Sequence, residues 1–192
     1  MPAVIIQAHN ESSVITRCLD ALAATAGSEE LEVVVVCNGC TDDTAVVSRD
    51  HPIAPVVIET EVPSKSNALN LGDAAATSFP RMYLDADIEL LPGSLEATFA
   101  ALRDGVHASA PKPVFSTGSS SLPVRMFYAA WRHVPYFNDS MIGSGVYAMD
   151  REGRSRFDAF PPIIADDGYV RLLFAEQERR AVGTGGFVVK AP

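Results

Sequence analysis

The sequence lacks any apolar run near the roughly 20 residues that a membrane-spanning helix needs. Residues 1–10 also lack a basic segment followed by a long apolar one, so a secretory signal is not expected. Basic residues are few: 15 Lys and Arg stand against 24 Asp and Glu, for a net charge of −9. Binding to nucleic acid or to an anionic membrane needs clustered positive charge, so neither is an expected partner. Membrane association is expected only through segments outside this chain.

Cysteine is also scarce, and the sequence contains none of the common nucleotide-binding loops. Cys18, Cys37 and Cys40 are too few for a disulfide framework, which favours a reducing, cytoplasmic location. There is no Walker-type loop and no G-x-G-x-x-G fingerprint. No glycine-rich activating loop occurs near residues 8–15, which argues against a nucleotidyltransferase.

What the sequence does contain is an alternation of short apolar strands with helical segments. The expected strands are residues 3–6, 31–37, 55–59 and 82–85, and residues with helical spacing lie between them. This rhythm predicts an α/β fold with an open, mostly parallel sheet flanked by helices on both faces. At 192 residues and 47% hydrophobic content, one domain over residues 1–192 is the simplest organisation.

That domain divides into two expected halves. Residues 1–110 carry the regular alternation and are expected to bind a nucleotide, whereas residues 111–192 are less regular and are expected to bind an acceptor. Residues 187–192 read as a strand cut short, so we expect the chain to be part of a longer protein.

Polar residues follow three of the predicted strands. They are His9-Asn10-Glu11, Asn38-Gly39 and Asp85-Ala86-Asp87. Ligands of open α/β sheets bind beyond the carboxyl ends of the strands, so these three clusters are expected to share one crevice.

Asp85 and Asp87 are the most informative pair. Side chains two residues apart on extended backbone point to the same side, where two carboxylates repel each other unless a cation lies between them. Hard oxygen ligands suit Mg²⁺ or Mn²⁺. The alternative is a solvated loop with two surface aspartates, and the position directly after a buried strand favours the metal site.

Five motifs in this order resemble glycosyltransferase family 2 over roughly residues 3–175. They are Ala8-His9-Asn10-Glu11, Cys37-Asn38-Gly39-Cys40-Thr41-Asp42-Asp43-Thr44, Lys65-Ser66-Asn67-Ala68-Leu69-Asn70, Tyr83-Leu84-Asp85-Ala86-Asp87 and Asp166-Asp167. The resemblance implies the GT-A fold, a Rossmann-like open mixed sheet, and transfer of a sugar with inversion of configuration. It also implies a UDP- or GDP-linked sugar as donor, and a glycan, a lipid or a small molecule as acceptor.

The resemblance assigns the donor-side residues position by position. The nucleotide would be lined by Ala8, His9, Asn10, Glu11, Asn38, Lys65, Asn67 and Asp85, with Asn70 helping to frame the lysine loop. Asp87 would bind the metal, and Asp85 would bind the ribose or a metal-bound water. Asn38 stands where the family usually has an aspartate that contacts the base, so the identity of the base stays open.

On the acceptor side, Asp167 corresponds to the catalytic base, with Asp166 in place of the family's common glutamate. The alternative is that Asp166 and Asp167 only cap a helix, and both roles are compatible. Gly143-Ser144-Gly145 matches the turn that borders the sugar or acceptor, and Trp131 is a candidate stacking residue, although core packing suits it equally. The Gln-x-x-Arg-Trp motif of processive synthases is absent, so a non-processive transfer is expected.

Two functions of other classes stay open. Cys37-Asn38-Gly39-Cys40 is a C-x-x-C between a strand and a helix, as in thioredoxin-like redox proteins. A non-catalytic nucleotide-binding module is the other, because Asn38 replaces the family's aspartate.

Overall fold

The computed structural model of the chain describes residues 1–26, 30–116, 126 and 145–190. Its strands are β1 (Ala3–Ala8), β2 (Glu32–Asn38), β3 (Val56–Thr60), β4 (Arg81–Asp85), β5 (Glu89–Leu90), β6 (Ala108–Ser116), β7 (Val146–Met149) and β8 (Arg179–Lys190). Its helices are α1 (Ile15–Ala26), α2 (Thr44–Arg49), α3 (Lys65–Ala75), α4 (Ser94–Ala100), α7 (Arg151–Arg154), α8 (Asp166–Leu172) and the 3₁₀ helix η1 (Glu176–Glu178).

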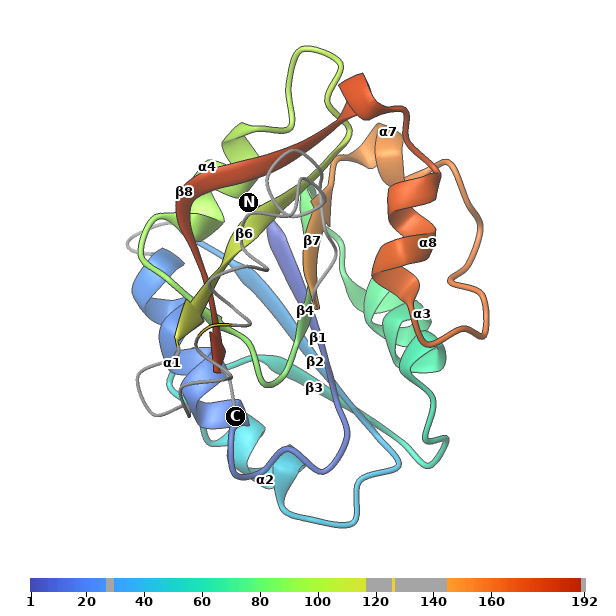
Figure 1. The fold of residues 1–192 in the computed structure, drawn as a ribbon. Helices are drawn as coiled ribbons and strands as arrows, with labels where there is room; N and C mark the ends of the chain where they lie inside the picture. Colours follow the sequence, from blue (N-terminus) through green and yellow to red (C-terminus); the bar gives the residue numbers. More distant parts are fainter. Residues whose placement is uncertain (27–29, 117–125, 127–144, 191–192) are drawn as a thin grey trace.

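The strands form one mixed sheet in the order β3-β2-β1-β4-β7-β6-β8-β5 (Figure 1). β3, β2, β1 and β4 run parallel, β7 is antiparallel to both β4 and β6, and β8 is parallel to β6. The predicted open mixed sheet is therefore confirmed, with its uninterrupted parallel part confined to the first four strands. Their carboxyl ends meet at one edge, where Gln7 on β1 is in register with Asp85 on β4.

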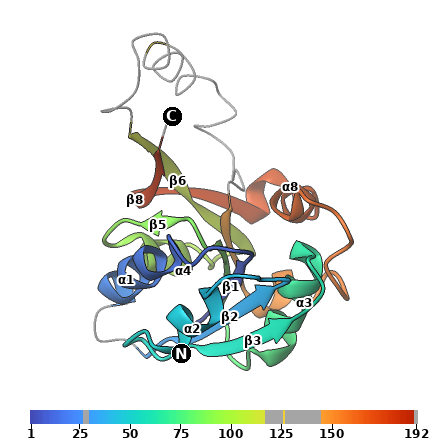
Figure 2. The same ribbon diagram turned by 90° about the horizontal axis from the view of Figure 1, so that it is seen from below.

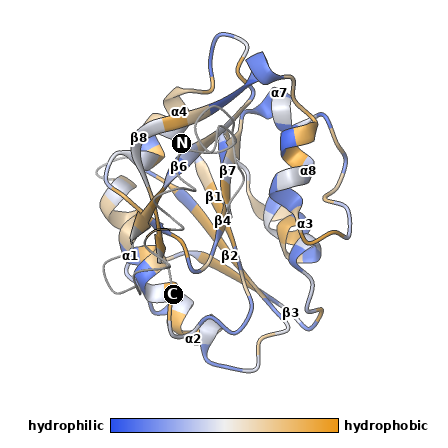
Figure 3. Ribbon diagram, viewed as in Figure 1, coloured by the Kyte–Doolittle hydropathy of each residue, from blue (hydrophilic) through white to orange (hydrophobic). Residues whose placement is uncertain are grey.

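The sheet is buried on both faces, and its central strands are apolar along most of their length. All six residues of β1 are buried, as are six of the seven in β2, which is typical of parallel strands covered on both sides. One core cluster lies between the sheet and α1, α2 and α4, and the other lies under α3 and α8. Figure 3 shows β1, β2 and β4 mostly in the hydrophobic colour, whereas the helices around them carry mixed colours.

The start of α3 is fixed by a serine side chain. Ser64 is the N-cap residue, and its hydroxyl accepts a hydrogen bond of 3.3 Å from the backbone N–H of Asn67. Lys65 is thereby fixed as the first residue of the helix, next to the carboxyl ends of the strands. The preceding helix, α2, begins at Thr44, after the N-cap residue Asp43.

The second half contributes strands that the sequence pattern hides. β6 contains Pro111 and Pro113, and its register with β8 shifts between these two residues. β8 contains Gly185 and Gly186 at φ +72° and +113°, and Figure 2 shows it beside β6 at the end of the molecule away from β3. Within the described residues, no helix is both long and apolar enough to cross a membrane.

Candidate active site

A pocket of about 240 Å³ lies at the carboxyl ends of β1, β2 and β4. It is lined by Gln7, His9, Glu11, Asn38, Lys65, Asp85, Ala86 and Asp87. Six of these were singled out from the sequence, and they come from all three strand ends and from the start of α3. The structure therefore brings together the three polar clusters that were expected to share a crevice.

Asp85 ends β4 at the centre of this pocket. Ile5 and Tyr83 face the core beneath α3 and α8, so Gln7 and Asp85, each two residues further along its strand, point to the same side. The amide nitrogen of Gln7 donates a hydrogen bond to Asp85 Oδ1, and the Nζ of Lys65 lies 2.8 Å from the same oxygen. Burial raises the pKa of Asp85 to about 6, although the Lys65 charge opposes that shift.

Lys65 joins the first half of the chain to the second. Its Nζ lies 2.8 Å from Asp85 Oδ1 and also 2.8 Å from Asp166 Oδ1. Burial disfavours the ammonium, but the two carboxylates outweigh that effect and raise the pKa of Lys65 to about 12. The lysine is therefore a permanent positive charge, held between two acids at the wall of the pocket.

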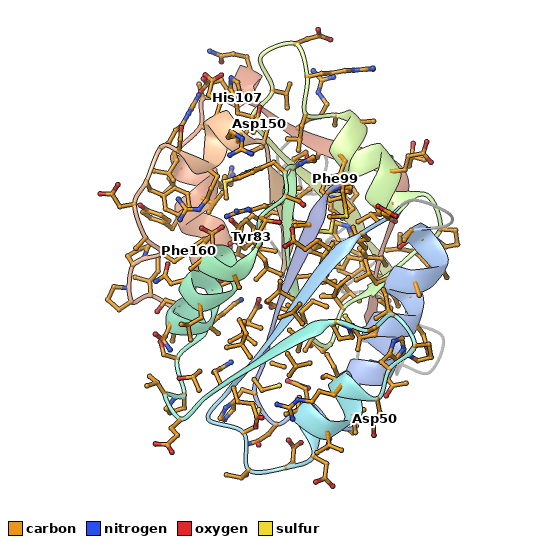
Figure 4. All side chains as sticks on the ribbon, turned by 180° about the vertical axis from the view of Figure 1, so that it is seen from behind. Asp50, Tyr83, Phe99, His107, Asp150 and Phe160 are labelled. Atoms are coloured by element: carbon orange, nitrogen blue, oxygen red, sulfur yellow. The ribbon has the colours of Figure 1, made fainter. Side chains whose placement is uncertain are left out.

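Asp166 is buried at the first position of α8, with 3% of its surface exposed. Its Oδ2 accepts a hydrogen bond of 2.8 Å from the hydroxyl of Tyr147 on β7. The Tyr147 ring stacks on that of Tyr83 with centroids 5.1 Å apart. Phe160 packs edge-on against Tyr83, and both of these residues are labelled in Figure 4. The carboxylate of Asp166 is thus held by a rigid aromatic core on one side and by Lys65 on the other.

Asp167, the expected base, is half-buried beside Asp166. Its Oδ1 accepts a hydrogen bond of 2.6 Å from the backbone N–H of Gly168. Burial raises the pKa of Asp167, while hydrogen bonds from Gly168 and Gly145 and the charge of Lys65 lower it, and the rise prevails. A carboxylate with a raised pKa is a stronger base than an ordinary aspartate.

The backbone of Gly145 contacts both Asp85 and Asp167. Its carbonyl accepts a 2.7 Å hydrogen bond from the backbone N–H of Asp85, and its φ of +82° is in the left-handed region. A Cβ atom at this position would lie 2.6 Å from Asp85 Oδ2. Only glycine lets the backbone approach the carboxylate this closely.

Asp87 and Glu11 supply the further negative charge of the pocket. Asp87 is exposed, and burial followed by the carboxylates of Asp87 and Asp42 raises the pKa of Glu11. Among the described residues no group of three or more His, Cys, Asp or Glu side chains could hold a metal ion by itself. Mg²⁺ typically binds through one or two carboxylates plus the phosphates of its substrate, and Asp85 with Asp87 fits that donor set.

The residues after β1 and β2 hold each other in place. Asn38 is buried and its amide donates a 2.9 Å hydrogen bond to the carbonyl of Ala8, while His9 Nδ1 donates to the carbonyl of Asn38. Asn10 has a positive φ of 56°, and its side chain accepts a 2.7 Å hydrogen bond from the backbone N–H of Thr41. His9 and Asn38 line the pocket, whereas Ala8 and Asn10 do not.

Several expected site residues lie elsewhere. Asn67 is half-buried in the first turn of α3 and does not line the pocket. The side chain of Asn70 exchanges two hydrogen bonds with the backbone of Phe160, of 2.7 and 3.1 Å, so it fastens α3 to the second half instead of framing the lysine loop. Trp131, Gly143 and Ser144 lie outside the described residues.

Gln7 is a pocket residue that sequence reasoning missed. Its side chain is 7% exposed, and its Oε1 is buried without a hydrogen-bond partner in the described part of the chain. The signal was a polar residue within the otherwise apolar strand AVIIQA.

Cys37, the first cysteine of the C-x-x-C motif, does not have the properties of a redox nucleophile. A reactive cysteine needs a lowered pKa, because the thiolate is the nucleophile. Burial, the largest cause, raises the pKa of Cys37 to about 12, and α2 begins only at Thr44, four residues beyond Cys40. The thioredoxin-like alternative therefore lacks support in the structure.

Comparison with known proteins agrees with this architecture. The family model "Glycosyl transferase family 2" matches residues 3–146, and the chain therefore belongs to that family. This confirms the resemblance and, at the level of the family, the expectation of a glycosyltransferase. A search of the curated proteins found no match.

Solved structures of sugar-transferring enzymes share this fold. A mannosyltransferase from Pyrobaculum calidifontis in complex with GDP-Man and Mn²⁺ superposes with a TM-score of 0.73 at 26% identity over 98% of this chain, which spans 55% of that protein. Glucosyl-3-phosphoglycerate synthase from Mycobacterium tuberculosis, in complex with Mn²⁺, UDP-Glc and phosphoglyceric acid, gives 0.66 at 19% identity over 97% of this chain and 70% of its own length. The fold is thus the GT-A fold that the sequence predicted.

Proposed function

We propose that this chain transfers a sugar from a nucleoside diphosphate sugar to an acceptor hydroxyl, with inversion and without processivity. The proposal rests on the pocket at the strand ends, where Asp85, Asp87 and Lys65 lie together. Asp166 forms an ion pair with Lys65 and directly precedes the base candidate Asp167 in the chain. Membership of glycosyl transferase family 2 supports the reaction class. The chain spans about half of the mannosyltransferase, so the activity of the whole protein is part of this proposal.

The electrostatics of the pocket support a divalent cation. Its lining carries three carboxylates, Glu11, Asp85 and Asp87, against the single ammonium of Lys65. A nucleoside diphosphate is itself anionic, so extra positive charge is needed for it to bind there. Mg²⁺ or Mn²⁺, held by Asp87 with Asp85, would stabilise the charge that develops on the departing diphosphate. The Mn²⁺ in the mannosyltransferase complex agrees with this choice of cofactor.

Asp167 is the proposed base on the acceptor side. An acceptor hydroxyl is weakly nucleophilic, so a carboxylate that removes its proton in the transition state accelerates the attack. The hydroxyl attacks the anomeric carbon from the face opposite the departing diphosphate, which inverts the configuration. Lys65 contributes a fixed positive charge near the diphosphate and needs no proton transfer of its own.

The donor is proposed to carry UDP or GDP. The mannosyltransferase is bound to GDP-Man, and the more distant synthase is bound to UDP-Glc. Asn38 offers an amide where the family usually has a carboxylate, and an amide presents both a donor and an acceptor to a base. The pocket therefore leaves both bases as candidates, with a glycan, a lipid or a small molecule as the acceptor.

Metal-dependent donor binding tests the proposal first. We expect wild-type protein to bind UDP or GDP more tightly with Mn²⁺ than with EDTA, measured by isothermal titration calorimetry. Asp87→Asn is expected to reduce the gain in nucleotide affinity that Mn²⁺ gives by a factor of about ten or more. Asp43→Asn, an exposed aspartate outside the pocket, is the control. Equal affinity with and without Mn²⁺ in wild-type protein would remove the metal assignment.

Asp167→Asn separates catalysis from binding. This variant is expected to bind the donor normally but to transfer sugar about 10²–10⁴-fold more slowly, because the base is lost. Since burial raises the pKa of Asp167, transfer by the wild type should fall as the pH drops through that raised value. Full transfer activity in the variant would reassign the base. Donor binding without transfer in the wild type, for every acceptor offered, would favour the non-catalytic module.

A further inference from the structure

The burial of Asp166 is at odds with a role in contacting the acceptor. Only 3% of its surface is exposed, whereas its neighbour Asp167 is half-buried. A side chain that an incoming sugar must touch needs accessible oxygen atoms. Both oxygens of Asp166 are already engaged inside the protein, one by Tyr147 and one by Lys65.

The partners of Asp166 form a chain that leads from the core to the pocket. Tyr147 is buried, stacks on Tyr83, and its hydroxyl donates a hydrogen bond of 2.8 Å to Asp166 Oδ2. Asp166 Oδ1 in turn lies 2.8 Å from the Nζ of Lys65. A buried carboxylate is stable only when it is paired and hydrogen-bonded, and these two contacts meet that condition.

Lys65 is the member of this chain that reaches the pocket. An ammonium has three N–H donors on a flexible four-carbon stem, so by itself it samples many positions. Asp85 and Asp166 each lie 2.8 Å from the nitrogen and restrict it from two sides. The ammonium is thus held between two carboxylates, and Lys65 lines the pocket in which a ligand would bind.

We propose that Asp166, oriented by Tyr147, is a positioning residue that holds the Lys65 ammonium toward the diphosphate of the donor. This role rests on the proposed function and replaces the acceptor contact that the sequence predicted for Asp166. A preset ammonium loses less side-chain entropy on binding the ligand than a free lysine does, which favours affinity. Tyr147 and Asp166 touch no ligand and act only through Lys65.

The test compares a nucleoside diphosphate with its nucleoside. UDP with uridine, or GDP with guanosine, is titrated into the full chain with Mn²⁺ by calorimetry. Asp166→Asn is expected to weaken binding of the nucleoside diphosphate about tenfold and to leave binding of the nucleoside unchanged. Only the diphosphate is proposed to contact Lys65. Tyr147→Phe, which removes one hydroxyl, is expected to weaken binding of the nucleoside diphosphate about threefold. Asp158→Asn and Tyr169→Phe make the same chemical changes outside the Lys65–Asp166–Tyr147 chain.

A double-mutant cycle with Lys65→Met separates positioning from a general structural effect. If Asp166 acts through Lys65, the Lys65→Met/Asp166→Asn protein binds the diphosphate no more weakly than Lys65→Met alone. The Lys65→Met/Tyr147→Phe pair should show the same lack of additivity, and it decides the matter if Asp166→Asn does not fold. Additive losses, or equal weakening of the nucleoside and the diphosphate, would overturn the role.

The two levels of the proposal fail in different ways. A wild-type chain that binds neither UDP nor GDP overturns the proposed function and this role with it. A wild-type chain that binds one of them, while the Asp166 and Tyr147 variants match wild type, overturns the positioning role alone.

Discussion

Gly145 packs its backbone directly against the carboxylate of Asp85. We predict that Gly145→Ala destabilises the protein by at least about 2 kcal/mol and abolishes nucleotide binding, because the new methyl group adds a clash to an unfavourable φ. Gly105→Ala is the matched control: its φ is +84°, but a Cβ atom there has no neighbour within 4 Å. The free energy of unfolding of Gly105→Ala should fall by about 1 kcal/mol, and its nucleotide affinity should be unchanged. Urea unfolding and calorimetry measure both effects, and equal losses in the two variants would contradict the steric explanation.

At the same scale, the sequence shows which residues carry chemistry better than it shows what they contact. His9, Glu11, Asn38, Lys65, Asp85 and Asp87 all reach the pocket, because strand ends of a parallel sheet meet at one edge. The sequence gives no sign that Asp166 turns inward to Lys65, since that direction depends on where α8 packs. Asn70 was misassigned for a similar reason: its partner, the backbone of Phe160, is 90 residues away.

Secondary-structure elements are predictable where their residues repeat regularly. β1, β2, β3 and β4 were expected within two residues of their observed bounds, because parallel strands buried on both faces are continuously apolar. β6 and the first part of β8 were not expected, since prolines and glycines interrupt both. Their pairing is set by contacts across the sheet, which a single-sequence pattern does not record.

Glu178 of the element η1 forms an ion pair with Arg156, which gives this element a predictable response to pH. Hydrogen bonds from Arg156, and then from the backbone N–H of Ala175, lower the pKa of Glu178 to about 2. A carboxylate whose pKa falls on folding stabilises the folded state above its unfolded pKa of 4.5. That contribution is lost as the pH falls from about 4.5 to about 2.

Glu178→Gln should therefore be less stable than wild type at pH 7 and nearly equal to it near pH 2. Urea midpoints measured across that range for both proteins, with the neighbouring Glu176→Gln as control, check the prediction. A difference between wild type and Glu178→Gln that stays constant with pH would show that the charge of Glu178 is not the cause.

Across the whole molecule, the described sheet does not divide where the sequence suggests two halves. β7, from the second half, lies between β4 and β6 and pairs with both. The division into a donor half and an acceptor half remains a prediction about function. The pairings of β7 with β6 and β4 join residues from 39 positions apart (Ser109 and Ala148) to 68 positions apart (Arg81 and Met149), which local patterns cannot predict.

The two halves are also joined by a buried charge cluster. Asp73 on α3 lies 2.6 Å from Arg81 Nη1 and 2.8 Å from Arg154 Nη2, and the hydroxyl of Tyr83 donates to it as well. We predict that Asp73→Asn lowers the free energy of unfolding by about 3 to 5 kcal/mol, because two enclosed guanidinium groups lose their counter-charge. Urea denaturation followed by circular dichroism measures this, with the exposed Asp158→Asn as control.

The same variant tells whether the halves unfold together. If the cluster joins them into one cooperative unit, Asp73→Asn shifts a single transition to lower urea with an unchanged slope. Two separated transitions would instead mean that the second half unfolds before the first. In that case Lys65 would lose its Asp166 partner while the strands of the first half stayed folded, and nucleotide affinity would fall at the first transition.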